Sequence, residues 1–171
     1  MPDSTLAKGF IGTAKKLVPT GAVRPTQANL RRAVSSCYYA VFHALAKVAA
    51  DSMVGAVKSK RSNKAWVEVY RGLGHGNCYQ GCKEASKKSF PQELQDFADA
   101  FVQLQNARHR ADYDPTFRLQ KKDVQIYLNL AEQSIITLNQ ASILDKRAFT
   151  TWVLISSPGA KKARELAGKS S

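Results

Sequence analysis

The sequence has few cysteines, few acidic residues and no long apolar run. Three cysteines in 171 residues are an odd and small number, which excludes the disulfide framework of a small secreted domain. No apolar run approaches the roughly 20 residues that cross a bilayer. The first residues also lack the cationic start and apolar block of a signal peptide. We therefore expect one cytoplasmic domain with no membrane segment.

The scarcity of acidic residues leaves a strongly basic chain. Lys and Arg number 26 against 13 Asp and Glu, a net charge of +13, and the isoelectric point is about 9.9. Cationic surfaces gain from counterion release when they bind polyanions, so this balance favours nucleic acid as a partner. Net charge alone does not define a site, and the other interpretation is simply a soluble basic surface.

The apolar residues repeat with helical rather than strand spacing. No segment alternates with period two long enough to predict a strand, whereas apolar stripes separated by Pro and Gly predict helices. The ranges are about 4–18, 26–51, 65–73 and 91–114, with a last helix from about 121 that continues or bends through Trp152. Residues 72–90, rich in Gly, Ser and Lys, are expected to form a connection with little structure.

These elements predict an all-α fold, an up-and-down bundle of four to five helices. We expect residues 1–156 to form the bundle, with Ser157-Pro-Gly159 ending the last helix and residues 157–171 forming a basic tail.

The second expected helix carries a polar face beside its apolar stripe. This face repeats at steps of three and four and consists of Arg32, Ser36, Tyr39, His43 and Lys47. Such residues at a core edge are more often structural than catalytic, so both interpretations stay open. An exposed basic loop, Lys58 to Lys64, is expected to follow this helix.

The densest group of chemical side chains lies at the end of the 91–114 helix. Its apolar series continues directly into Arg108 and Asp112, and a buried arginine needs an acceptor such as a carboxylate one turn away. His109 stands three residues before Asp112 and four before Tyr113, so one turn holds four functional groups. The alternative is an ordinary i,i+4 ion pair that ends a helix before Pro115.

Metal and cofactor motifs are weak or missing. His75, Cys78 and Cys82 have a spacing that could offer three zinc ligands, but no fourth ligand is near in sequence. Two small cysteines in a loop is the favoured interpretation. The glycines at 72–76 lack the preceding strand and the Lys-Ser/Thr ending of a phosphate loop. We therefore predict no metal and no cofactor.

Two stretches resemble motifs of one protein family. LRRAVSSCYYAVFH at 30–43 is similar to the R-x-A-x4-Y-Y-A-x-F-H pattern of bacterial HEPN-domain proteins, and RHRADYD at 108–114 is similar to their later R-x-x-A-D-Y pattern. The resemblance covers about residues 4–155. It implies a compact helical bundle that dimerises.

The resemblance also implies a chemistry. Active HEPN ribonucleases hold an Arg and a His, four to six residues apart, at the dimer interface, where a ribose 2′-OH attacks its own phosphate without a metal. Arg108 would steady the phosphate charge. Tyr113 stands where this family has its histidine and could hydrogen-bond a phosphate, so His109 or His43 would have to carry the proton.

Three hypotheses follow. The first is a HEPN-type RNA-acting protein, a metal-independent endoribonuclease of a toxin or defence system, whose protein partner could be a minimal nucleotidyltransferase antitoxin. Its catalytic set would be Arg108, His109, Asp112, Tyr113 and His43, and its RNA-binding set Arg32, Tyr39, Lys58, Lys60, Arg61 and Lys64. The second is a bundle that lost its chemistry and binds protein or RNA. The third is a small nucleotide-binding domain that uses the basic loop for phosphates.

Overall fold

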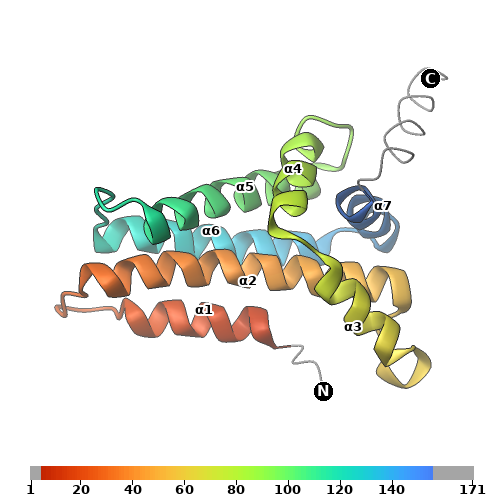
Figure 1. Cartoon of the computed structure of the whole chain (residues 1–171), viewed down its shortest axis with the longest axis horizontal. Helices are drawn as coiled ribbons and strands as arrows, with labels where there is room; N and C mark the ends of the chain where they lie inside the picture. Colours follow the sequence, from red (N-terminus) through yellow and green to blue (C-terminus); the bar gives the residue numbers. More distant parts are fainter. Residues whose placement is uncertain (1–4, 156–171) are drawn as a thin grey trace.

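The computed structural model describes residues 5–155, and these form an all-helical bundle (Figure 1). This confirms the predicted fold class. The described part contains no strand and seven α-helices with one 3-10 turn, where four to five helices were expected. Their bounds are α1 Leu6–Leu17, α2 Gln27–Val54, η1 Lys58–Lys60, α3 Asn63–Gly72, α4 His75–Ala85, α5 Gln92–Tyr113, α6 Lys121–Gln140 and α7 Ile143–Leu154.

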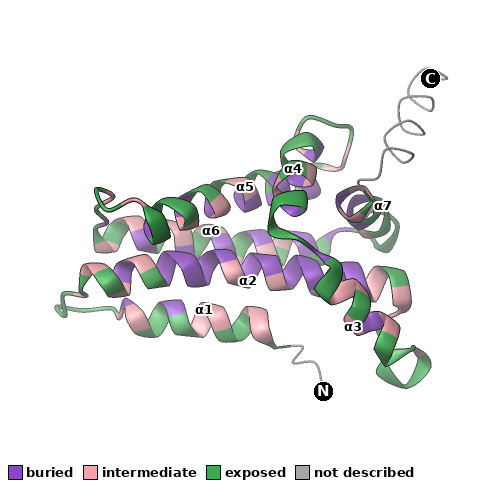
Figure 2. Cartoon of the chain, viewed as in Figure 1, coloured by how far each residue is buried: buried purple, intermediate pink, exposed green. Residues whose placement is uncertain are grey.

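Four long helices form the body of the bundle. They are α1, α2, α5 and α6. Helix α1 runs antiparallel to α2, and α5 runs antiparallel to α6 (Figure 1). Helix α2 lies at the centre and packs against α1, α5 and α6, and most of its surface is buried (Figure 2). The shorter helices α3 and α7 also pack against α2, and α4 packs against α5 and α7.

Helix α2 is built for close packing. The Thr26 side chain accepts a hydrogen bond from the Asn29 backbone N–H at 3.2 Å and caps the helix, which ends at Gly55 with a φ of 117° that favours glycine. Six of its buried residues are alanines, and together with the small Cys37 they let neighbouring helices approach: Ala33, Ala40, Ala44, Ala46, Ala49 and Ala50.

The segment 72–90 is more ordered than its sequence predicts. It was expected to have little structure, but it contains helix α4, whose Cys78, Cys82 and Ala85 are buried in the core. Gly81 lets α4 approach α7, since a Cβ at this position would lie 3.1 Å from the Cα of Val153. The helix is short and three of its apolar contacts come from small residues, so its amphipathic pattern is weak in the sequence.

The last expected helix is also different. Residues 121–154 form two helices, α6 and α7, because the chain breaks at Ala141 and Ser142. The Ser142 side chain accepts a hydrogen bond from the Asp145 backbone N–H at 3.1 Å and caps α7. Helix α7 then turns back to place Phe149 and Val153 in the core.

Helix α2 has the length and apolar character of a membrane span. An 18-residue window of the segment Gln27–Lys60 has a mean hydropathy of 1.4, and half of that window is buried inside the bundle. The central helix of a soluble bundle meets the same criterion, so this feature is weak evidence for a membrane. The expected helix end at Ser157-Pro-Gly159, the boundary near residue 156 and the basic tail lie outside the described residues.

Candidate functional site

The two motif stretches found in the sequence pack against each other as neighbouring turns of α2 and α5. Arg31 donates from Nη1 to the Ala111 carbonyl at 2.8 Å, and the Ser35 hydroxyl donates to Oδ1 of Asp112. One turn further along α2, the Tyr39 hydroxyl accepts a hydrogen bond of 3.3 Å from Nη2 of Arg108. The motifs are therefore one structural unit.

Arg108 lies at the centre of this unit. Its Nε is 2.8 Å from Oδ2 of Asp112, which forms the i,i+4 ion pair predicted from the spacing. Nε is buried and has no hydrogen-bond acceptor, so the contact is ionic rather than a directed hydrogen bond. The guanidinium carbon lies 5.7 Å from the ring centre of Tyr39 and 5.6 Å from that of Tyr113. Arg108 is thus held by one carboxylate and by aromatic rings.

His75, from the first turn of α4, faces the same aromatic rings. Its Nδ1 is 2.6 Å from the Tyr38 hydroxyl, and its ring stacks on Phe42 with centres 4.1 Å apart. The Gln105 side chain also donates to the His75 carbonyl at 3.3 Å, which ties the start of α4 to α5. Since Arg108 and His75 both lie against Tyr38 and Tyr39, a cation and an imidazole share one cluster.

A second imidazole extends the cluster toward α1 and α3. Nδ1 of His43 is 2.8 Å from the Tyr70 hydroxyl, and the His43 ring stacks on Phe10 with centres 5.3 Å apart. Phe10 also stacks on Tyr39 at 5.5 Å, so the same phenyl ring joins the two parts. Five helices, α1 to α5, therefore contribute to what we call the Arg/His cluster: Phe10, Tyr38, Tyr39, Phe42, His43, Tyr70, His75 and Arg108.

The surroundings set the protonation of these groups. Loss of hydration and the nearby positive charge of Arg108 lower the pKa of His75, and loss of hydration and the neighbouring His75 lower that of His43. Burial raises the pKa of the Tyr38 hydroxyl, so it keeps its proton. Burial alone would lower the pKa of Arg108, but Tyr39 and Asp112 outweigh it and the net shift is upward. The cluster therefore combines two neutral imidazoles with one fixed cation at neutral pH.

Two other residues of the predicted catalytic set, Tyr113 and His109, lie outside the Arg/His cluster. Tyr113 lies at its rim, 64% exposed and beside Arg108. His109 is exposed and its ring packs on Tyr113 with centres 5.0 Å apart, and no contact joins it to Arg108. Its position next to Arg108 in sequence puts it about 100° around the helix, which explains the separation.

The polar face of α2 is only partly a site. Tyr39 and His43 belong to the Arg/His cluster, but Ser36 is buried and donates to the Arg32 carbonyl at 2.9 Å. Arg32 is exposed. Lys47 forms an ion pair with Asp51, on a stretch of α2 beyond the cluster.

The basic loop contains one arginine, Arg61, whose guanidinium is held by hydrogen bonds, an ion pair and an aromatic ring. Arg61 Nη1 donates to Asp51 Oδ1 at 3.1 Å and to the Gly55 carbonyl at 3.0 Å, and its guanidinium lies 4.3 Å from the Trp66 ring centre. Its side chain is only 9% exposed. Lys58, Lys60 and Lys64 are exposed. Arg61 therefore anchors the loop, and the lysines form its outer surface.

His75, Cys78 and Cys82 do not form a metal site. Both cysteines are buried, burial raises their pKa values, and the His75 ring is turned toward Tyr38 and Phe42. No group of three or more His, Cys, Asp or Glu side chains within residues 5–155 could hold a metal ion. The same segment instead supplies the histidine of the Arg/His cluster, a role that the sequence analysis missed. Its only local signal was a lone histidine at the start of a short helix.

Comparisons with family models, with curated proteins and with solved structures give no match to this chain. A function for this protein is therefore inferred from the residues of the Arg/His cluster and from the chemistry that they permit.

Proposed function

We propose that this protein acts on RNA, as a HEPN-type metal-independent endoribonuclease, and that Arg108 and His75 are its central groups. The observation that carries the proposal is that a guanidinium and a neutral imidazole, from α5 and α4, share the Tyr38 and Tyr39 rings. The net charge of +13 and the two motifs that resemble HEPN proteins support an RNA substrate in the cytoplasm.

The residues suggest how such cleavage would proceed. In the tautomer whose Nδ1–H donates to the Tyr38 oxygen, the His75 Nε2 carries a lone pair that can take the proton of a ribose 2′-OH. The O2′–P bond forms and the P–O5′ bond breaks, which leaves a 2′,3′-cyclic phosphate and a 5′-hydroxyl end. Arg108 would stabilise the charge that develops on the phosphate. The proton taken up by His75 is released to solvent, and O5′ takes a proton from solvent.

The first test is incubation of the purified protein with total RNA in EDTA. We expect cleavage by the parent and about a 100-fold slower cleavage by Arg108→Ala, since loss of one group that stabilises the transition state has effects of this size. Arg108→Lys should retain part of the rate because it keeps the charge but loses the planar fork. Equal cleavage by Arg108→Ala and the parent would contradict the proposal.

We also propose a homodimer that pairs through the α5 face carrying Tyr113, so that two clusters meet at a shared basic cleft. The 64% exposure of this tyrosine at the rim of the cluster supports an uncovered surface there. Tyr113→Glu should convert the dimer to a monomer in sedimentation velocity. A monomeric parent protein would contradict the proposed homodimer.

A neighbouring gene for a minimal nucleotidyltransferase would support a toxin–antitoxin or defence role with that protein as partner.

A second candidate is a bundle that binds protein or RNA without chemistry. The observation that favours it is the ion pair of Arg108 with Asp112, which already balances the arginine charge. In this case RNA stays intact with the parent in EDTA and with added Mg²⁺, while Arg108→Ala still lowers the thermal midpoint. The cleavage assay therefore separates the two candidates.

A further inference from the structure

We propose that a groove between α1, α2, α6 and α7 docks an acidic amphipathic helix of a partner protein. The α1 residues that line this groove do not include Phe10, whose ring belongs to the Arg/His cluster. The proposal concerns a separate surface and goes beyond the proposed RNA chemistry.

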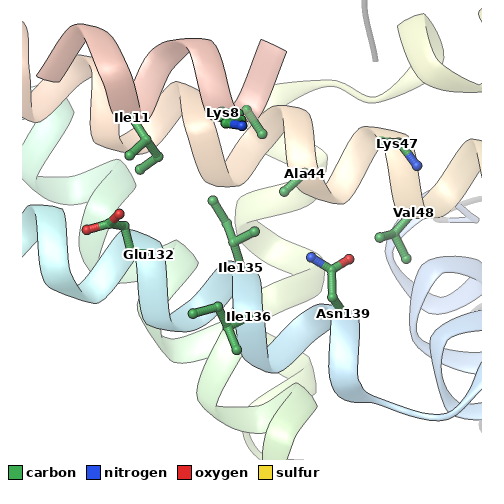
Figure 3. A pocket seen from close by; sticks show the side chains of 10 residues that line it. Lys8, Ile11, Ala44, Lys47, Val48, Glu132, Ile135, Ile136 and Asn139 are labelled. Carbon is green, nitrogen blue, oxygen red and sulfur yellow. The ribbon is translucent and has the colours of Figure 1, made fainter. Parts of the chain in front are cut away.

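The groove consists of two adjoining hollows. The first, about 470 Å³, is bounded by Ala7, Lys8 and Ile11 of α1, by α2, and by Ile135 and Ile136 of α6 (Figure 3). The second, about 320 Å³, continues along α2 to Gly55 and Ala56 and is closed by Ile143, Lys146 and Arg147 of α7. Lys47, Val48 and Asn139 border both hollows, so they form one continuous groove.

The length and position of the groove suit a helix. Helix α1 begins at Leu6, and its first turn lies beside Ala44 and Lys47 of α2. Helix α2 continues to Val54, and its last turns line the second hollow. From Ala44 to Gly55 the track is roughly 16 Å at 1.5 Å per residue, about three turns of a docked helix.

The apolar part of the groove is unusually exposed for a core edge. Ile136 is 47% exposed and Ile143 is 68% exposed, and the two line adjoining hollows. Exposed apolar side chains that line a hollow typically mark an interaction surface. A helix with leucine-type residues spaced by three and four would cover both isoleucines.

The charges of the groove select an acidic partner. Lys8, Lys146 and Arg147 have no carboxylate partner within residues 5–155, whereas the two lining carboxylates are already paired. Glu132 pairs with Lys15 at 2.6 Å, and Asp51 pairs with Lys47 and Arg61. The residual charge is therefore positive. The chain's own last residues, 156–171, are basic in sequence and match it poorly, as does a second copy with a net charge of +13.

The test uses the full chain and a fluorescent synthetic helical peptide of about 18 residues, with leucines on one face and glutamates on the other. We expect saturable binding in fluorescence anisotropy that weakens with salt. A peptide with lysines in place of the glutamates should bind at least about tenfold more weakly, because it meets Lys8, Lys146 and Arg147.

Matched variants locate the binding. Ile136→Glu should weaken the peptide about tenfold through loss of one apolar anchor, and Lys8→Glu should weaken it through charge. The controls are Ile126→Glu, which is an exposed isoleucine of the same helix outside the groove, and Lys122→Glu. All four positions are at least 47% exposed or fall in the exposed class, so the variants should keep the parent thermal midpoint.

Each remaining outcome overturns the proposal. Equal binding of the glutamate and lysine peptides would refute an acidic partner, and equal binding by the parent and Ile136→Glu would refute the groove. A dimer of the parent that Ile136→Glu converts to a monomer would assign the groove to a second copy instead. RNA cleavage is expected to be the same in the parent and in Ile136→Glu, so failure here leaves the proposed RNA function standing.

Discussion

Arg61 and Arg108 each contact a carboxylate and aromatic rings, but they differ in their other hydrogen bonds and in their exposure to solvent. Arg61 pairs with Asp51 and lies 4.3 Å from the ring centre of Trp66. Arg108 pairs with Asp112 and lies between 5.6 and 6.0 Å from three tyrosine rings. Arg61 also donates to two backbone carbonyls, at 3.0 and 3.3 Å, and its side chain is 9% exposed, against 22% for Arg108.

The difference separates a structural arginine from a candidate catalytic one. The acceptors around Arg61 are Asp51 near the end of α2, the Gly55 and Ala56 carbonyls of the loop and Asn63 at the start of α3, so Arg61 holds the loop between these two helices. Arg108 has one long hydrogen bond to Tyr39 and a neighbouring histidine with a lowered pKa. An arginine that can still meet a phosphate beside a neutral imidazole is what an RNA-cleaving site needs.

Removal of Arg61 should give the largest change in stability. Arg61→Ala removes one of the two cations paired with the largely buried Asp51, two hydrogen bonds to backbone carbonyls and the contact with the Trp66 ring, and we expect a loss of about 3 kcal/mol in the free energy of unfolding. Urea denaturation measures it. Lys60→Ala, in the same loop, should stay within about 0.5 kcal/mol of the parent. A loss below about 1 kcal/mol for Arg61→Ala would remove the contrast between the two arginines.

Removal of Arg108 should have a smaller effect on stability. The pair with Asp112 is partly exposed, so we expect Arg108→Ala to cost about 1 kcal/mol in urea denaturation, from the ion pair and its ring contacts. Asp112→Asn, which keeps the shape and removes the charge, should cost no more than this. A loss as large as that of Arg61→Ala would make Arg108 a structural residue and favour the bundle without chemistry.

The lysines of the basic loop should affect RNA affinity rather than cleavage chemistry. Replacement of Lys60 and Lys64 by alanine removes two exposed charges, which should reduce the salt dependence of RNA binding by about two in the slope of log affinity against log salt. The cleavage rate at saturating RNA should stay that of the parent. An unchanged slope would place the loop outside the RNA path.

The smallest expected effect is on the pH dependence of stability. His43 and His75 have pKa values below the ordinary 6.5 in the folded state, so the unfolded chain binds more protons as the pH falls through 6.5. The free energy of unfolding should therefore decrease from about pH 7.5 to about pH 5.5. Urea denaturation of the double variant His43→Gln/His75→Gln should show a shallower decrease. A parallel decrease in parent and variant would exclude these imidazoles as the cause.

Much of the helical framework could be predicted from local patterns. The apolar stripes and Pro115 after α5 set the expected bounds of α2 and α5 within about three residues of those observed. The Arg108–Asp112 pair also followed from its spacing, and the structure confirms it at 2.8 Å.

The features that the sequence did not predict are helix α4, the break before α7 and the position of His75, and most of these depend on packing between distant segments. Helix α4 forms because small residues such as Cys82 and Gly81 fit between α5 and α7, which no local pattern reveals. The break before α7 had a local signal, the Ser142–Asp145 cap, that a continuous apolar stripe concealed. His75 and Tyr38 are 37 residues apart in the sequence, so their contact could not be predicted from a local pattern. For this reason the sequence pointed to His109, and not to His75, as the histidine nearest to Arg108.

The most direct test of the central claim compares two histidines in one assay. The parent, His75→Gln and His109→Gln are incubated in EDTA with a labelled RNA oligonucleotide and with the same oligonucleotide lacking its 2′-OH groups. We predict that His75→Gln loses cleavage by about 100-fold or more, that His109→Gln cuts like the parent, and that the DNA version stays intact. Loss of cleavage in His109→Gln with full activity in His75→Gln would contradict the assignment of the site to the Arg/His cluster.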